Sequence, residues 1–135
     1  MKLIEFYREL FLEARGTYEP VWEETAVPDG YCWRKQDYPL HEQFQVKANR
    51  SGYPIILYSL ILPECYLDTT IYEEIKRYPS SSELSLVILN RRIWLNAALP
   101  ADKLADSLMG HIHRTRGELM NILDCVVRLP REIKA

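Results

Sequence analysis

The clearest alternation of apolar and polar positions lies in residues 83–100, which read ELSLVILNRRIWLNAALP. Two runs rich in apolar residues flank Asn90 and Arg91, and Pro100 closes the second run. Because successive side chains of a strand point to opposite faces, the pattern predicts a β-hairpin with one fully apolar face and a second face that is nearly apolar. Asn tolerates the left-handed backbone of a two-residue turn, whereas Arg after it is a weaker choice than Gly.

Helical periodicity marks both ends of the chain. Apolar residues recur at steps of three and four over residues 2–15, and Gly16 follows where a C-terminal cap belongs. This helix either packs on the core or presents its apolar face to a partner or a second copy of the chain.

A longer helical pattern follows Pro100. It predicts one long helix or two pieces, because Gly110 and Gly117 both lower helix propensity.

Strand patterns occupy much of the region between these helices. Tyr18, Val21 and Trp22 begin a first strand, the turn at residues 28–30 follows it, and residues 31–33 continue as a short strand. A second hairpin joins an alternating run to a strongly apolar one, residues 44–48 and 53–62. Residues 55–62 are apolar at nearly every position. We therefore expect that strand to be central, and covered on both faces or on one face plus a subunit interface.

A short middle helix is predicted over Thr69–Arg77, after Pro63 ends the preceding strand. Asp68, Thr69 and Thr70 are all good N-cap residues, and Thr70 with Glu73 has the spacing of a capping box.

Together these elements predict an α+β fold: an antiparallel sheet flanked by an N-terminal helix, a short middle helix and a long C-terminal helix. The length of 135 residues is that of a single domain, residues 1–135. Residues 129–135 carry a proline and mixed charge, and we expect them to form an extended C-terminal arm.

The charge of the chain indicates which class of partner to expect, and its cysteines indicate the compartment. Seventeen basic and nineteen acidic residues give a formal net charge of −2, without a concentrated basic stripe, which disfavours nucleic acid as a partner. Three widely spaced cysteines without a CxxC pair predict a reducing compartment rather than a disulfide framework. Acidic residues interrupt the N-terminal apolar run, and no apolar stretch is long enough to span a membrane. We therefore expect a cytoplasmic protein.

Candidate chemistry is sparse. His111 and His113 are two positions apart, so on a helix they point to nearly opposite sides and cannot bind one metal ion. Cys125 lies close to the apolar row of the last helix, where a buried inert thiol is expected. The sequence contains no GxSxG motif and no glycine-rich phosphate loop. These patterns predict no enzyme activity, no metal and no cofactor.

Four arginines form local basic spots: Arg91 and Arg92 at the predicted hairpin turn, and Arg114 and Arg116 on the last helix. They are either solvated surface residues or contacts to nucleic acid. If the fold brought all four onto one surface, the second interpretation would be favoured.

The order of elements resembles that of the type III secretion chaperone-like fold, especially its YbjN-like and uncharacterised bacterial branches. The residues that carry the resemblance are 86–90, 92–95 and 97–100, followed by a helix from Ala101. The resemblance implies an α+β domain that is often a homodimer, binds a protein segment and lacks catalysis. It implies no active-site residues.

The leading hypothesis is a non-enzymatic protein-binding module, chaperone-like or a regulatory adaptor, that acts as a dimer. Its predicted contacts to a partner or a second copy are Val87, Leu89, Trp94, Tyr58 and Leu60. We expect the first three to lie beneath a helix or in a dimer contact, and their exposure in a monomer would contradict that expectation. The alternatives are a regulator that contacts nucleic acid through the four arginines, and an enzyme with a noncanonical pocket.

Overall fold

A computed structural model describes residues 3–15, 22–35, 40–48, 50–78, 84–100 and 105–127. Its α-helices are α1 (Leu3–Arg15), α2 (Thr69–Arg77) and α3 (Ala105–Val127), and a short 3-10 helix, η1, spans Glu64–Tyr66. Its strands are β1 (Trp22–Val27), β2 (Gly30–Lys35), β3 (His41–Ala48), β4 (Pro54–Ile61), β5 (Leu84–Leu89) and β6 (Arg92–Pro100). In this part of the chain, no helix is both long and apolar enough to cross a membrane.

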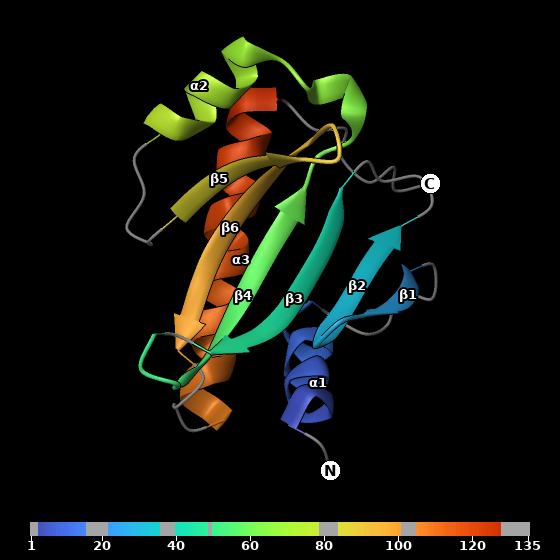
Figure 1. Ribbon diagram of the computed structural model, residues 1–135, viewed down its shortest axis with the longest axis vertical. Coiled ribbons are helices and arrows are strands. Elements are labelled where there is room, and N and C mark those ends of the chain that lie inside the picture. The colour runs from blue at the N-terminus through green and yellow to red at the C-terminus, as the bar shows by residue number, and fades with distance from the viewer. Residues whose placement is uncertain are drawn as a thin grey trace.

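The six strands form one sheet in the order β1-β2-β3-β4-β6-β5, and each strand is antiparallel to its neighbours (Figure 1). The first four strands follow one another across the sheet. The chain then passes through α2 and returns as the hairpin β5–β6, in which β6 lies beside β4 and β5 forms the edge. The predicted α+β fold, with its antiparallel sheet and three helices, is confirmed.

Two tight turns contain residues other than glycine in left-handed backbone. Asn90 and Arg91 have φ angles of 52° and 62°, and Leu89 pairs with Arg92, so β5–β6 is a two-residue hairpin of the type that needs left-handed backbone at both central positions. Asp29 has a φ of 60° in the turn between β1 and β2. Gly30 follows it where a Cβ would meet the carbonyl oxygen of Phe44 at 1.8 Å, so only glycine fits.

The helices begin and end close to the predicted positions, with one correction at a cap. The N-cap of α2 is Asp68, whose side chain accepts hydrogen bonds from the backbone N–H groups of Thr70 and Ile71 at 2.7 Å and 3.3 Å. The predicted capping box of Thr70 and Glu73 is therefore wrong, because Thr70 already lies inside the helix. α3 is one continuous helix through both of its glycines.

Several predicted features lie outside the described residues. They are the start of the first strand at Tyr18 and Val21, the helix-ending Gly16, the beginning of the last helix at residues 101–104, and the C-terminal arm at 129–135.

The core lies between one face of the sheet and the helices α1 and α3, which run behind the sheet in Figure 1. In β4 the even-numbered residues from Ile56 to Leu60 face the helices, as do the odd-numbered residues of β6 from Ile93 to Leu99. Phe11 joins α1 to the sheet, because its ring lies 4.8 Å from that of Phe44 and 5.5 Å from that of Tyr58, measured between centroids. One buried cluster thus connects residues from both ends of the described chain.

Candidate protein-binding surface

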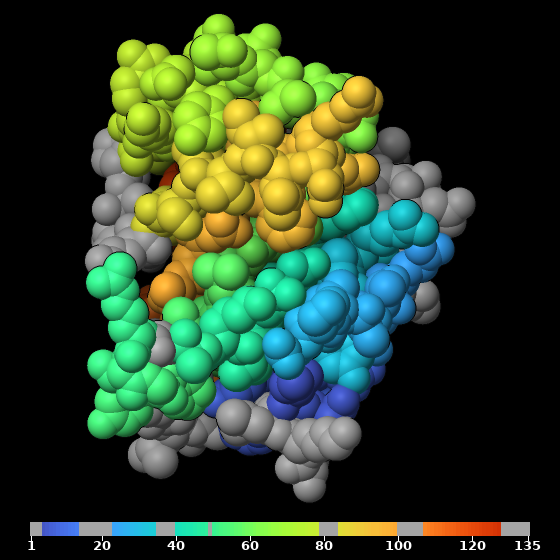
Figure 2. Space-filling model, in the orientation of Figure 1, coloured from blue at the N-terminus to red at the C-terminus, as the bar shows by residue number. Residues whose placement is uncertain are grey.

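The sheet face opposite the helices, called here the open face, is the candidate site. Strand alternation and register place on it the side chains that point away from the core: residues 23, 25 and 27 of β1, 32 and 34 of β2, 41, 43, 45 and 47 of β3, 55, 57, 59 and 61 of β4, 85, 87 and 89 of β5, and 92, 94, 96 and 98 of β6. Figure 2 views the molecule from this side, and the strands are visible across it. No described helix covers this face (Figure 1).

An apolar patch occupies the end of the open face near the β5–β6 turn. We call it the hairpin patch, and it consists of Val87, Leu89, Trp94 and Ile61. Val87 is 44% exposed and Leu89 is 50% exposed. The indole Nε1 of Trp94 donates to the carbonyl oxygen of Leu89 at 3.2 Å, which holds the half-buried ring against the turn. Ile61 is buried, so the exposed part of the patch consists of Val87, Leu89 and the half-buried ring of Trp94. Neighbouring exposed apolar side chains of this kind are typical of a contact surface.

Small neutral side chains fill the middle of the open face. One row across the sheet runs through Cys32, Gln43, Ser59 and Asn96, which are paired from strand to strand. Ser59 and Asn96 are buried even though they point away from the helices, and the Ser59 hydroxyl donates to Oδ1 of Asn96 at 2.6 Å. Gln43 is buried as well, so three of the four side chains in this row are already shielded from solvent, and the row carries no charge.

A cationic group lies beside the hairpin patch. Arg34 and His41 are direct cross-strand partners, His41 pairs with Ile61, and Ile61 pairs with Trp94, two residues from Arg92. Burial lowers the pKa of His41, and the positive charges of Arg92 and then Arg34 lower it further. Burial raises the pKa of the Cys32 thiol, while the same two arginines oppose that rise. Both guanidinium charges therefore act on this corner of the open face.

The structure distributes the predicted contact residues over two faces. Val87, Leu89 and Trp94 lie together on the open face, and no described helix covers them. Of the two expected arrangements, beneath a helix or in a dimer contact, the dimer contact stays a prediction. Tyr58 and Leu60 are 1% and 0% exposed and face α1 and α3. Their prediction as partner contacts needs correction, because strand alternation turns the even-numbered residues of β4 into the core.

The four predicted arginines do not share a surface. Arg91 is exposed at the hairpin turn, Arg92 belongs to the open face, and Arg114 is exposed on α3, which packs against the opposite face. Arg116 also comes from α3, and its Nε donates to Oε1 of Glu42 at 2.6 Å. The interpretation of Arg116 as a surface contact to nucleic acid is therefore corrected, because its guanidinium binds a carboxylate that is only 2% exposed.

The carboxylate of Glu42 is the centre of a polar network inside the core. It points from β3 toward the helices, accepts a second hydrogen bond from Arg116 at 3.2 Å, and accepts one from the Tyr58 hydroxyl. Two nitrogen atoms of Arg116 bind the two carboxylate oxygens, a bidentate geometry that fixes the relative orientation of the side chains. This network connects α3 to the centre of the sheet.

Two further predictions concern reactive side chains. Cys125 is exposed rather than buried, because it lies at the side of the apolar row of α3 and not within it. Among the described residues, no group of three or more His, Cys, Asp or Glu side chains could hold a metal ion.

Sequence reasoning missed Glu42, His41 and Arg34. It began the β3 strand at Phe44, whereas the strand begins at His41. Extending the alternation back by three residues would have placed Glu42 on the same face as Phe44, and a carboxylate in an apolar row indicates a buried partner. The grouping of Arg34, His41 and Arg92 depends on strand order and was not accessible from sequence.

Comparisons of this chain with protein-family models, with curated proteins and with solved structures found no match.

Proposed function

We propose that this protein is a non-enzymatic, cytoplasmic protein-binding module, chaperone-like or a regulatory adaptor, that acts as a dimer. The observation that carries the proposal is the hairpin patch on a sheet face that no described helix covers. In the described part of the chain, helices cover one face of the sheet and not the other. The second face would expose apolar area that soluble proteins normally bury against another protein or a second copy.

The composition of the open face supports a protein partner. Its apolar part includes a tryptophan, a residue enriched among those that contribute most to binding at protein interfaces. The neutral row beside it carries no charge, so a partner that packs on the hairpin patch does not have to bury a charged side chain of that row. The order of helix, strands, helix, hairpin and helix also has the layout that the resemblance to secretion chaperone-like proteins implies.

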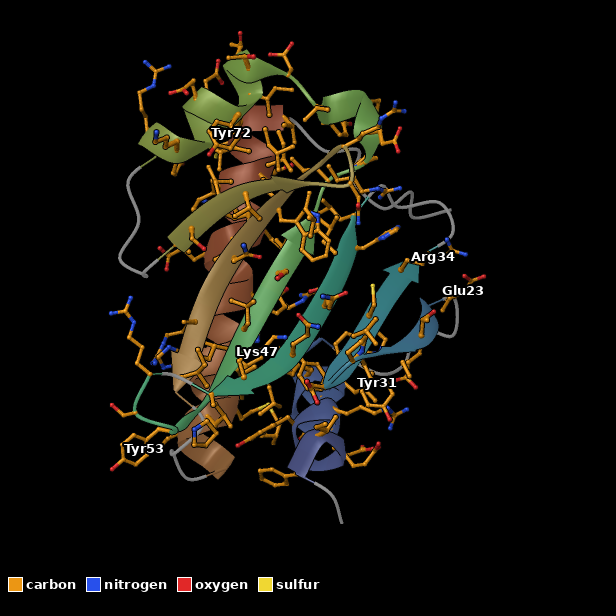
Figure 3. All side chains as sticks on the ribbon, viewed as in Figure 1. Glu23, Tyr31, Arg34, Lys47, Tyr53 and Tyr72 are labelled. Carbon is orange, nitrogen blue, oxygen red and sulfur yellow. The ribbon has the colours of Figure 1, made fainter. Side chains whose placement is uncertain are left out.

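The experiment compares the unmodified protein with a double variant, Val87→Ser with Leu89→Ser. Both side chains are exposed, so their replacement should leave the fold intact. The matched control is Tyr53→Ser, which removes a side chain that is 67% exposed at the end of the sheet away from the β5–β6 turn (Figure 3). Each protein is measured by size-exclusion chromatography with light scattering and used as bait in an affinity pull-down with mass spectrometry.

We expect the unmodified protein and the Tyr53→Ser control to form a dimer and to retain the same specific partner. We expect the double variant to lose one or both interactions while its circular dichroism spectrum stays unchanged. A protein that is strictly monomeric and retains no partner in the pull-down would contradict the proposal. So would a double variant that assembles and binds as the unmodified protein does.

A further inference from the structure

Three cationic or titratable side chains lie at the end of the open face where the hairpin patch is also found. Arg34 is at the end of β2, His41 begins β3, and Arg92 begins β6. Figure 1 shows these ends of the strands at the same end of the sheet, and Figure 3 shows Arg34 there beside Glu23. Arg92 affects the pKa of His41 more than Arg34 does, although Arg34 is its direct cross-strand partner. The charge of Arg92 therefore acts on His41 across the intervening strand β4.

In the part of the chain that the structure describes, an acidic side chain pairs with only one of the two arginines of this group. Arg34 binds Glu23 through a 2.7 Å contact between Nε and Oε2, and both side chains are 58% exposed, so the pair is readily exchanged for another anion. Among the described residues, Arg92 makes no ion pair with a carboxylate. Glu42 is the next residue after His41, but it points to the other face and is bound by Arg116. One arginine charge on the open face thus remains without an acidic partner among the described residues.

Apolar side chains border the cationic group on one side. Ile61 lies between His41 and Trp94 in the sheet register, and Val87 follows Trp94 on the edge strand. A ligand that placed an anionic group near Arg92 and His41 could therefore place neighbouring apolar groups on Trp94 and Val87. The distance from β3 to β5 across the sheet is about 15 Å at the usual strand spacing, which a short peptide segment can span.

We infer that Arg34, His41 and Arg92 form a binding site for a carboxylate of a partner protein segment whose adjacent apolar side chains pack on the hairpin patch. The inference rests on the proposed protein-binding function and names the chemistry of the partner: an acidic residue flanked by apolar ones. Arginine presents paired N–H donors that match a carboxylate, and a partly desolvated site strengthens that contact.

The surroundings favour a carboxylate peptide over nucleic acid. Binding to a nucleic-acid backbone draws on several cations that follow successive phosphates. Here the neighbours of the cationic group on the open face are apolar or neutral side chains and the acidic Glu23, and Arg114 lies on α3, behind the sheet. One anionic contact beside an apolar patch fits a protein segment better.

The test begins with selection of random displayed peptides on the full-length protein. The most enriched peptide is then synthesised with its acidic residue and with the matching amide, and binding is measured by fluorescence anisotropy. The protein variants are Arg92→Gln and the control Arg114→Gln, which makes the same charge change on α3. Labelled single-stranded RNA of a single base type serves as the nucleic-acid probe. Circular dichroism checks that each variant is folded.

We expect the enriched peptides to share an acidic residue next to apolar ones. Binding should weaken by roughly tenfold when the peptide acid becomes an amide or when Arg92 becomes glutamine, the loss expected for one charge-assisted contact. Arg114→Gln should bind as the unmodified protein does. Combining the peptide amide with Arg92→Gln should weaken binding no further than either change alone, because both remove the same contact.

Two outcomes would overturn the inference in distinguishable ways. Enriched peptides that lack acidic residues and bind Arg92→Gln undiminished would refute the carboxylate site and leave the proposed protein-binding function standing. Failure to enrich any peptide, with RNA binding that is lost in Arg92→Gln, would refute the carboxylate site and assign the cationic group to nucleic acid, whereas the proposed function is tested separately by the dimer and pull-down measurements. Failure of both probes to bind would also refute the carboxylate site.

Discussion

Glu42 is the residue whose surroundings differ most from the ordinary behaviour of its type. A carboxylate that is 2% exposed is stable only because Arg116 and Tyr58 supply its hydrogen bonds. The pair is asymmetric, since the Arg116 side chain is 23% exposed and can reach water, whereas Glu42 cannot. Removal of the Arg116 side chain therefore leaves the Glu42 carboxylate buried without a counter-charge.

Replacing Arg116 with methionine should destabilise the fold by roughly 3 kcal/mol or more, because it leaves the buried Glu42 without its counter-charge. The matched control is Arg114→Met on an exposed position of the same helix, which should change the free energy of unfolding by no more than about 0.5 kcal/mol. Urea denaturation followed by circular dichroism measures both. Equal effects of the two variants would show that the ion pair contributes little to stability.

His41 should make the stability of the fold depend on pH. Burial and two arginine charges lower its pKa in the folded protein, so the unfolded chain binds more protons between that lowered pKa and the ordinary value of about 6.5. The unfolding free energy contributed by His41 therefore rises with pH through this window and is lost as the pH falls. His41 is partly exposed, and the charges around it on the open face are those of Arg34, Arg92 and the Glu23 that pairs with Arg34.

The variant His41→Gln should accordingly lose less stability than the unmodified protein when the pH is lowered from above the window to below it. Urea midpoints at several pH values measure this difference. If His41 did not titrate abnormally, the urea midpoints of the two proteins would change with pH by the same amount.

The hairpin β5–β6 is the element in which local sequence and backbone disagree most. Its turn places both Asn90 and Arg91 in left-handed backbone. Asn adopts that conformation readily, but Arg is strained there. Its strands nevertheless pair in full register, so the apolar alternation and the packing of β6 against β4 outweigh the unfavourable turn residue.

Replacing Arg91 with glycine should therefore stabilise the protein by about 1 kcal/mol, because it creates the Asn-Gly turn without backbone strain. The control Arg91→Ala removes the same side-chain charge but keeps the strain, and it should not stabilise. Thermal unfolding of the three proteins distinguishes the effects. If alanine raised the melting temperature as much as glycine, removal of charge rather than relief of strain would be the cause.

Over the whole molecule, the helices are distributed unevenly about the sheet. α1 and α3 bury one face, and the open face places the hairpin patch beside neutral and cationic side chains. A dimer formed through that patch would link folding to association, since each copy would bury apolar area that is exposed in the isolated chain.

The midpoint of thermal unfolding should therefore rise with protein concentration. The double variant Val87→Ser with Leu89→Ser should show no such dependence. Calorimetry over a wide concentration range measures it for both proteins. A midpoint independent of concentration in the unmodified protein would argue against a dimer that is stabilised by this patch.

The sequence by itself determined the elements, because strand alternation, helical periodicity and turn chemistry are local properties. The hairpin at Asn90, the helix at Thr69–Arg77 and the apolar faces of both hairpin strands all follow from residues that are close along the chain. Tertiary structure alone decided which apolar face the helices would cover, because that choice depends on how distant elements pack. It buried Tyr58 and Leu60, left Val87 and Leu89 exposed, and paired Arg116 with Glu42 across 74 positions of sequence. It also brought Arg34, His41 and Arg92 to one corner of the sheet, since strand order is set by the long-range pairing of β4 with β6.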